Sequence, residues 1–410
     1  VAFVGMSMLI GFMVDAIGVA AQTMMNRTGL ELSIVDGGWT TMANISWAWP
    51  YAFAMFPLQV GVNIVMLMLN KTNTFNADLW NVWGKIFTAF IVVSVTTPLF
   101  GPVWSLVLAF IVAAFQIIME LNAGDIHQHR IEKLTGIPGV TCTHTTLTFC
   151  AVMYPIACLL KKIPGMDRKF DTETLRNKFG IFAENHVLGF ILGCLFGAVA
   201  RYAFADVLIL GVKAATAMTL FPVVAKYFMQ ALSPISEAMS EFMNKKFEGK
   251  ELNVGLDWPI MGGCNEIWLT ILWSIPFMLL FSAILPGNGI LPFAGLMGSS
   301  LAVPAFLVTQ GNLIQMFILA AISCPIFLWV GTAFAPFMTE LATVTGSVSL
   351  NAGELISNSL INGPVFTYSI SHVFQFLQGN FIPLIILVVW FVCFISYYRA
   401  LRKEEAEDLA

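Results

Sequence analysis

The sequence predicts an all-α polytopic membrane protein with roughly ten or eleven transmembrane helices plus re-entrant hairpins. Composition leads to this fold class. Hydrophobic residues make up 58% of the 410 residues and charged residues only 11%, whereas a soluble globular chain carries about 25% charged residues. A chain this apolar could not cover a soluble surface, which excludes a soluble enzyme and a disordered chain. The net charge of −4 gives no attraction for phosphate backbones, so no nucleic-acid partner is expected.

Long apolar runs supply the expected membrane spans. An α-helix needs about 20 apolar residues to cross a bilayer. The runs of suitable length are 46–69, 103–118, 143–160, 187–204, 207–232, 267–285, 313–336 and 381–398, with a shorter run at 85–99. The run 1–25 is interrupted by Asp15, and because the chain begins inside it we expect an earlier segment to precede Val1. Residues 1–410 are treated as one membrane-embedded unit.

Two regions do not fit plain spanning helices. Residues 287–311 are interrupted by five glycines and two prolines, and residues 344–375 mix Gly, Ser, Asn and Thr with short apolar runs. Irregular backbone at membrane depth is tolerated only where it packs in protein or lines a polar cavity, and broken helices mark the binding sites of transporters. We expect at least one re-entrant hairpin here. An external loop is the alternative.

Three basic segments set the orientation. They are 161–178, 245–250 and 399–403, and the positive-inside rule places all three in the cytoplasm. The rule requires an even number of crossings between the second and third segments. Only three plain apolar runs lie there, so one further crossing is expected within a broken region.

A threonine-rich turn is the first candidate site. Residues 139–146 open an apolar run with four threonines and His144. Thr143 fits a helix N-cap, and a neutral His144 beside Thr145 could both donate to and accept from a sugar hydroxyl. The alternative is a histidine hydrogen-bonded to a backbone carbonyl.

Carboxylates at breaks in the apolar pattern are the second set of candidates. Glu184 and Asn185 precede an apolar run and suit a polyol, whose hydroxyls need donors and acceptors, although a plain helix N-cap fits as well. Asp257 and Glu266 flank a stretch broken by proline and glycine, where a carboxylate could orient a hydroxyl or accept its proton. A capping aspartate is the alternative for Asp257. Further polar notches contain Asp36, Trp39, Asn265 and Asn312.

Other polar residues are interpreted more conservatively. Trp80, Asn81 and Trp83 fit an interfacial belt, with Lys85 and Thr88 one to two turns beyond. His127 and His129 are expected in an exposed loop, 124–130, rather than a metal site. The seven cysteines are expected as free thiols. We expect no metal and no cofactor. Because no Walker loop or nucleophile elbow is present, any phosphoryl group must arrive on a partner.

Several segments together resemble a known family. They are VDGGW (35–39), ADLWNVWGKIFTAF (77–90), THTT (143–146), KFGIFAENHVLGF (178–190), VGLDWPIMGG (254–263), LPGNGILPFAGL (285–296) and TQGNLIQ (309–315). In this order and spacing they resemble the galactitol-type enzyme IIC of the bacterial phosphoenolpyruvate-dependent sugar phosphotransferase system. The resemblance covers nearly the whole chain, and a more distant one links it to the ascorbate-type enzyme IIC.

The resemblance implies a fold and a mechanism. It implies a homodimer in the bacterial cytoplasmic (inner) membrane, surrounded by lipid, in which each protomer has a scaffold domain and a core that carries the substrate as an elevator. The polyol or sugar would be phosphorylated on the cytoplasmic side by a phosphocysteine on a separate B subunit, which an A subunit recharges. Family site residues map onto His144, Asp257, Glu184, Asn185 and Asp36.

Residues and resemblance together give the expected site. Asp257 or Glu184 would act on the hydroxyl to be phosphorylated, with His144 as its hydrogen-bond partner. The full set of expected substrate-binding residues is Asp36, Trp39, Thr88, Thr143, His144, Thr145, Glu184, Asn185, Asp257, Asn265, Glu266 and Asn312. One rival is an ion-coupled secondary transporter of a polyol or a sugar acid such as ascorbate, in which the carboxylates bind H⁺ or Na⁺. A second rival is a non-transporting scaffold, although a scaffold has no reason to carry buried charges.

Overall fold

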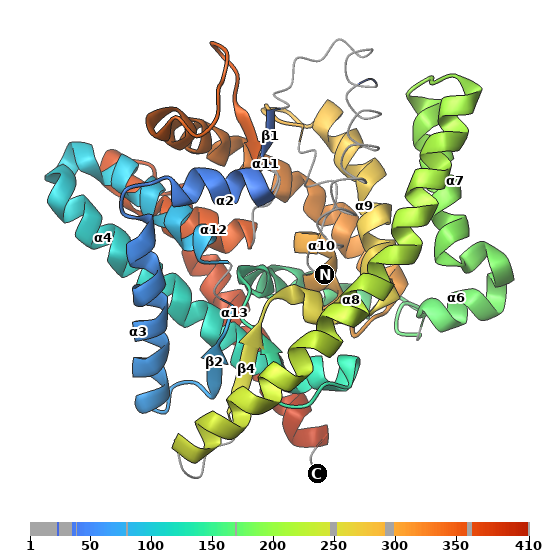
Figure 1. The fold of residues 1–410 in the computed structure, drawn as a ribbon, viewed down its shortest axis with the longest axis horizontal. Helices are drawn as coiled ribbons and strands as arrows, with labels where there is room; N and C mark the ends of the chain where they lie inside the picture. The colour runs from blue at the N-terminus through green and yellow to red at the C-terminus, as the bar shows by residue number, and fades with distance from the viewer. Residues whose placement is uncertain are drawn as a thin grey trace.

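A computed structural model describes residues 23, 35–37, 39–78, 81–168, 170–246, 252–291, 299–358 and 363–408, and it is built mainly of helices (Figure 1). The helices are α2 (Trp39–Trp47), α3 (Met55–Met68), α4 (Val82–Thr135), α5 (Cys150–Leu160), α6 (Thr172–Phe179), α7 (Asn185–Val199), α8 (Phe204–Lys246), α9 (Asn265–Ile284), α10 (Ser299–Thr309), α11 (Leu313–Thr345), α12 (Pro364–Ser371) and α13 (Ile382–Asp408). Short 3₁₀ helices are η1 (Ala52–Ala54), η2 (Thr145–Phe149), η3 (Gly180–Ala183), η4 (Trp258–Met261) and η6 (Val373–Gln378).

The helices confirm the polytopic membrane class. Within the described residues, four helices are long and apolar enough to cross a bilayer, namely α4, α9, α11 and α13. Two bent pairs, α2 with α3 and α6 with α7, raise the number to six if each pair counts as one span. The finer number of roughly ten or eleven spans is not established by these helices.

Helix α4 is a hairpin rather than one straight rod. Its backbone breaks at Gly101 (φ 75°, ψ 170°), which lies between Pro98 and Pro102. Lys85 Nζ lies 2.6 Å from Glu120 Oε2, so the arms before and after the break fold back on each other. The expected runs 85–99 and 103–118 are these two arms.

The second arm of α4 continues through the segment expected as an exposed loop. Residues 124–130 are helical, and His127 is buried, with Nε2 3.1 Å from the Tyr397 hydroxyl of α13. The expected loop is therefore wrong. The interfacial belt is also wrong for Asn81 and Trp83, both of which are buried. Leu79 and Trp80 lie outside the described residues.

Two further runs differ from plain spans. The run 46–69 is bent by 96° between α2 and α3. The run 207–232 lies inside the longer α8, which packs closely on α7 (Figure 1). Glycine makes this approach possible, because a Cβ on Gly193 would lie 2.6 Å from the carbonyl oxygen of Leu210. Small residues at such crossings bring helices together in membranes.

The two broken regions contain short helices. Helix α10 has 11 residues and, at about 1.5 Å per residue, is too short to cross a hydrocarbon core of about 30 Å. Gln310 (φ 54°) and Gly311 (φ 79°) turn the chain from α10 into α11. Helix α12 has eight residues and follows β5 (Ile356–Asn358). Residues 292–298 and 359–362 lie outside the described part.

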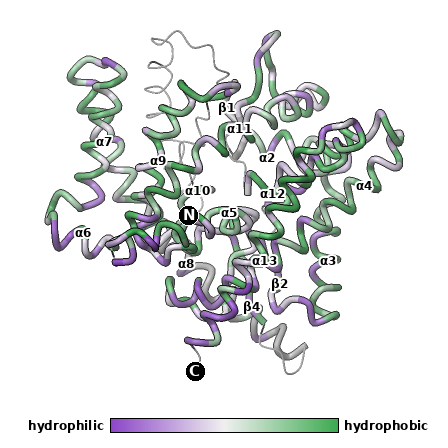
Figure 2. The backbone as a smooth tube through the Cα atoms, turned by 180° about the vertical axis from the view of Figure 1, so that it is seen from behind, coloured by the Kyte–Doolittle hydropathy of each residue, from purple (hydrophilic) through white to green (hydrophobic). Residues whose placement is uncertain are grey.

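The starts of α9 and α11 lie beside the same segment of the chain. Helix α9 begins beside the basic segment 161–178, where the Thr172 amide donates to Glu266 Oε1 at 3.1 Å. Helix α11 begins beside the same segment, since the Leu313 amide donates to the Phe170 carbonyl at 2.7 Å. The chain must therefore return between Ile284 and Leu313. Figure 2 shows hydrophilic positions near α6 and near the C-terminus.

Short parallel strands, which the sequence pattern did not reveal, form two small sheets. One sheet pairs β1 (Val35–Gly37) with β5, and the other has the order β2-β4-β3. Strands β2 (Thr74–Asn76), β4 (Asn253–Leu256) and β3 (Val140–Cys142) are all parallel. Asn63 of α3 holds β2 through its side chain, which donates to the Thr74 carbonyl at 2.8 Å and accepts from the Asn76 amide at 2.9 Å. Because the strands are parallel, their carboxyl ends meet at one edge.

Candidate functional site

Three titratable side chains leave the strands at this shared edge. Asp78 follows β2 by two positions, His144 follows β3 by two, and Asp257 follows β4 directly. Close packing draws the strands together. A Cβ on Gly255 of β4 would collide with the Thr143 methyl group and lie 2.8 Å from the Thr74 methyl group. Segments that are far apart in the sequence therefore place their polar side chains at one edge of the sheet.

His144 and Asp257 face each other without a hydrogen bond. His144 Nε2 lies 3.9 Å from Asp257 Oδ1, beyond hydrogen-bonding distance. His144 Nδ1 accepts the Thr146 amide at 3.4 Å, which leaves the proton on Nε2. Burial first, and then the charge of Lys85, lower the pKa of His144 to about 3, so the ring is neutral. A donor thus faces an acceptor, which is the arrangement that a hydroxyl group can bridge.

Asp78 is the second carboxylate at this edge. The Asn81 side chain donates to both of its oxygens, at 3.0 and 2.8 Å. Burial raises the pKa of Asp78. Desolvation, and then the charge of Asp78, raise the pKa of Asp257 well above its usual range, although the Asp257 side chain keeps 26% of its surface exposed. The two carboxyl groups are therefore close enough to disfavour simultaneous ionisation.

A buried ion pair on α4 contacts the residues of this edge. The side chains of Lys85 and Glu120 are 1% and 0% exposed and lie 2.6 Å apart. Thr145 donates its hydroxyl to Glu120, and Lys85 Nζ donates to the Asn81 carbonyl at 3.3 Å. Lys85 was expected only one to two turns beyond an interfacial belt, and Glu120 was not among the expected residues. Lys85 begins the apolar run 85–99 and Glu120 closely follows the run 103–118, so a charge at the end of each run was the signal that could have found both.

The threonine-rich turn completes the same cluster. Thr143 donates to Asn76 Oδ1 at 2.9 Å, so it links β3 to β2. The Asn76 Nδ2 atom is buried and has no hydrogen-bond partner in the described part of the chain. Thr88 is buried on α4, where its hydroxyl donates to the Gly84 carbonyl at 3.2 Å. A polar ligand bound at this edge could accept a hydrogen bond from this amide.

The start of α12 covers this turn. Gly363 adopts φ +60°, and a Cβ at that position would lie 2.6 Å from the Thr145 carbonyl oxygen. Only glycine combines this backbone angle with such an approach. The second broken region thus packs directly onto the turn that carries His144.

Glu184 and its expected companions lie in a second group. Glu184 Oε1 pairs with Arg176 Nε at 2.8 Å, and its side chain is 34% exposed. The Asn185 side chain donates to Asn265 Oδ1 at 3.1 Å, which joins the starts of α7 and α9. Glu266 holds the amide of Thr172, as described above. The structure therefore brings His144 and Asp257 together and gives Glu184 different neighbours.

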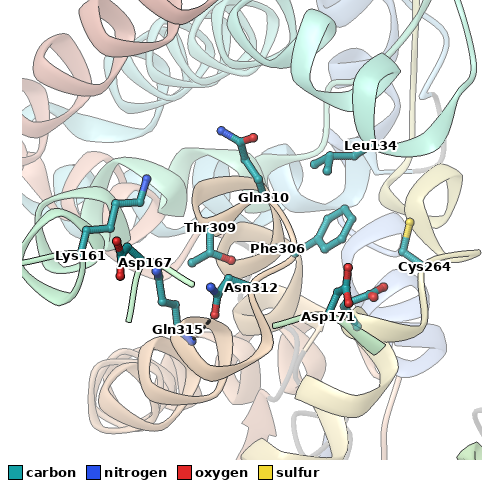
Figure 3. Close-up of a pocket in the computed structure, with 12 residues that line it drawn as sticks. Leu134, Lys161, Asp167, Asp171, Cys264, Phe306, Thr309, Gln310, Asn312 and Gln315 are labelled. Atoms are coloured by element: carbon teal, nitrogen blue, oxygen red, sulfur yellow. Dashed lines mark hydrogen bonds between the residues drawn. The ribbon is translucent and has the colours of Figure 1, made fainter. Parts of the chain in front are cut away.

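A cavity of about 620 Å³ adjoins this second group (Figure 3). The turn between α10 and α11 lines it with Thr309, Gln310 and Asn312, while Lys161 and Asp167 lie to one side and Cys264 to the other. The Asn312 side chain donates to the Arg168 carbonyl at 2.8 Å. The cavity is therefore bounded by the basic segment 161–178.

Two expected site residues are described only by their backbone. Asp36 lies in β1 opposite Ser357 of β5, and Trp39 begins α2. Their side chains lie outside the described part of the structure.

Comparison with known proteins gives a consistent set of similarities. A model of the family described as PTS system sugar-specific permease component (EIIC-GAT) matches residues 1–353. The proteins named PTS system galactitol-specific EIIC component in Escherichia coli strains K12 and O157:H7 are each 33% identical over 382 residues, which covers 92% of this chain and 82% of the relative. A putative permease IIC component of strain K12 is 28% identical over 375 residues, or 90% of this chain and 84% of that protein. The range matched by the family contains β2, β3 and β4.

Proposed function

Because this chain belongs to the family of sugar-specific permease components of the phosphotransferase system, we propose that it carries a sugar alcohol such as galactitol across the bacterial inner membrane. A phosphocysteine on a separate B subunit would phosphorylate the substrate at the cytoplasmic side, and an A subunit would recharge it. The observation that carries the proposal is the unbridged pair of His144 and Asp257, 3.9 Å apart at the strand edge. The 33% identity to galactitol-specific relatives supports the choice of substrate.

The site chemistry follows from the protonation states. A substrate hydroxyl would accept from His144 Nε2–H and donate to Asp257. As the S–P bond of the phosphocysteine breaks and the new O–P bond forms, the hydroxyl proton passes to the Asp257 carboxylate. The raised pKa of Asp257 makes it a stronger base than an exposed aspartate. Glu184 remains the second candidate for this role.

The remaining expected residues divide between two places. Thr143, Thr145 and Thr88 belong with the edge that carries His144. Glu266 and Asn312 line the cavity beside segment 161–178, and Asn265, which accepts from Asn185, precedes Glu266 at the start of α9. We assign these four residues to the cytoplasmic route of the substrate. Asp36 and Trp39 complete the proposed set of substrate-binding residues.

The proposal includes an architecture. We infer about ten or eleven spans, a homodimer with a scaffold and a mobile core that moves as an elevator, and docking of the B subunit on segment 161–178. The family resemblance supports the dimer and the elevator. The bent helix pairs, the break in α4 and the short helices α10 and α12 support a chain with more passages than its four long apolar helices.

Uptake with phosphorylation tests the function. Inside-out vesicles that contain this chain, the A and B subunits and the general phosphotransferase proteins are given phosphoenolpyruvate and labelled galactitol. We expect labelled phosphate ester. Asp257→Asn and His144→Ala should each lower its rate at least about thirty-fold, since a lost hydrogen bond to a charged or buried group costs about 2 kcal/mol or more.

Two results would contradict the proposal. Glu354→Gln, which changes an exposed carboxylate paired with Asn351, is the control and should keep the full rate. If Asp257→Asn and His144→Ala both behave like this control, the site assignment is wrong. If uptake persists in cells that lack the general phosphotransferase proteins, an ion-coupled transporter replaces the proposed function.

A further inference from the structure

The charges at the strand edge do not balance. Among the described side chains, Asp78, Asp257 and Glu120 contribute three carboxyl groups, and Lys85 contributes one ammonium group that pairs with Glu120 at 2.6 Å. His144 is neutral. When Asp78 and Asp257 share one proton, the edge keeps one net negative charge.

We propose that Asp78 and Glu120 are specificity-determining residues that make this edge reject anions, so that it binds a neutral polyol but neither a sugar acid nor the phosphorylated product. The inference rests on the proposed function and extends it to product release. A polyol enters without charge. Phosphoryl transfer then places a monoester of nearly two negative charges at neutral pH beside three carboxyl groups, and the product leaves.

The ion pair explains why Lys85 does not act as a phosphate anchor. Its ammonium is buried, pairs with the Glu120 carboxylate and donates to the Asn81 carbonyl. To reach a phosphate it would have to leave Glu120 buried and unpaired, which costs several kcal/mol. Glu120 is fixed in turn by the Thr145 hydroxyl and by Gln116 Nε2 at 2.9 Å. The Lys85 ammonium therefore stays paired with the Glu120 carboxylate.

Coulomb's law sets the size of the effect. A carboxylate about 8 to 10 Å from a unit negative charge disfavours it by roughly 15- to 30-fold at an effective dielectric constant of about 20. Two charges on the monoester increase the penalty. The ratio of anion affinity to polyol affinity is therefore the quantity that reports this charge.

Competition binding measures that ratio. The purified chain in lipid nanodiscs binds labelled galactitol, which is displaced by unlabelled galactitol, by its phosphate monoester and by galactonate. We expect galactonate to bind at least about 15-fold more weakly than galactitol, and the doubly charged monoester more weakly still. Asp78→Asn and Glu120→Gln should each reduce this ratio by roughly 15- to 30-fold. The ratio is independent of the fraction of each variant that folds.

Asp125→Asn is the matched control. Asp125 is a carboxylate on the same helix, but it accepts the Asn73 amide and the Thr74 hydroxyl at the opposite end of β2. Because Asp125 is farther from the edge, its ratio should change by a smaller factor than that of Asp78→Asn. If the wild-type chain binds the monoester within threefold of galactitol, or if Asp78→Asn and Glu120→Gln leave the ratio unchanged, the inference is overturned. If the wild-type chain binds no polyol at all, the proposed function fails instead.

Discussion

Removal of the Lys85 ammonium tests whether the α4 hairpin depends on its buried ion pair. In Lys85→Met the side chain keeps its approximate length but loses its charge, and Glu120 is left with no cation at a position that is 0% exposed. Breaking a buried pair from one side costs about 3 to 5 kcal/mol. The lost hydrogen bond to Asn81 adds about 1 kcal/mol. We expect the free energy of unfolding to fall by roughly 4 to 6 kcal/mol.

A double variant separates the effect of an unpaired buried charge from the effect of replacing the Lys85 side chain. In Lys85→Met/Glu120→Gln the new amide oxygen can still accept from Thr145, and no charge is left unpaired. Replacing a buried pair by neutral groups is often close to neutral, so the double variant should recover at least about 2 kcal/mol of the single loss. Lys71→Met, which changes an exposed lysine before β2, should stay within about 0.5 kcal/mol of the wild type.

Unfolding by sodium dodecyl sulfate in mixed micelles, followed by tryptophan fluorescence, gives these free energies. The reasoning is refuted if Lys85→Met costs less than about 1 kcal/mol, or if the double variant is no more stable than the single one. Either result would mean that Lys85 and Glu120 are not a buried pair across the hairpin.

Three further predictions concern close packing and titration. Gly255→Ala forces a Cβ against Thr143, so binding of galactitol should be lost and stability lowered by about 1 to 3 kcal/mol, measured by nanodisc binding and unfolding. Gly193→Leu places a side chain against the Leu210 carbonyl and should push α7 away from α8. Cysteine cross-linking between the two helices should therefore become less efficient. The raised pKa of Asp78 makes the folded chain hold a proton that the unfolded chain loses near pH 4, so this residue's stabilisation falls as pH rises toward the folded pKa. Asp78→Asn should flatten that decline in unfolding curves between pH 4 and pH 8.

Long apolar helices were predictable because one property decides them. Helices α9, α11 and α13 cover the runs 267–285, 313–336 and 381–398, with their main differences at the C-terminal ends of α11 and α13. A hydropathy pattern predicts only the apolar part of a helix, which contacts lipid. It does not predict a polar extension of the same helix, because that extension is stabilised by residues elsewhere in the chain. The end of α13 is an example, since Lys133 of α4 pairs with Asp408 at 2.6 Å.

The same limit explains the error at 124–130. A loop was expected because the segment is polar, yet His127 and Arg130 are buried against α13 and α10. Arg130 donates to the Leu307 carbonyl at 2.9 Å and to the Tyr397 hydroxyl at 3.2 Å. Polarity there reflects contacts between helices that are distant in sequence, and a pattern along one segment cannot reveal them. The three-residue strands were missed because they are too short to show a period of two.

The site residues found from sequence and those missed follow one physical rule. His144 and Asp257 were found because each stands at a break in an apolar run, where glycine, proline or threonine also signals irregular backbone. Glu120 was missed because it stands inside a regular helix with no such signal. A strand end at depth in a membrane protein leaves backbone groups that water cannot satisfy, so polar side chains must gather there. Regular helices packed around the edge add further charged side chains, as α4 does with Lys85 and Glu120. A buried charge within a helix is therefore evidence for a polar edge elsewhere in the fold. A search for polar residues at breaks in apolar runs, combined with a search for charges inside regular helices, would have led to Lys85 and Glu120.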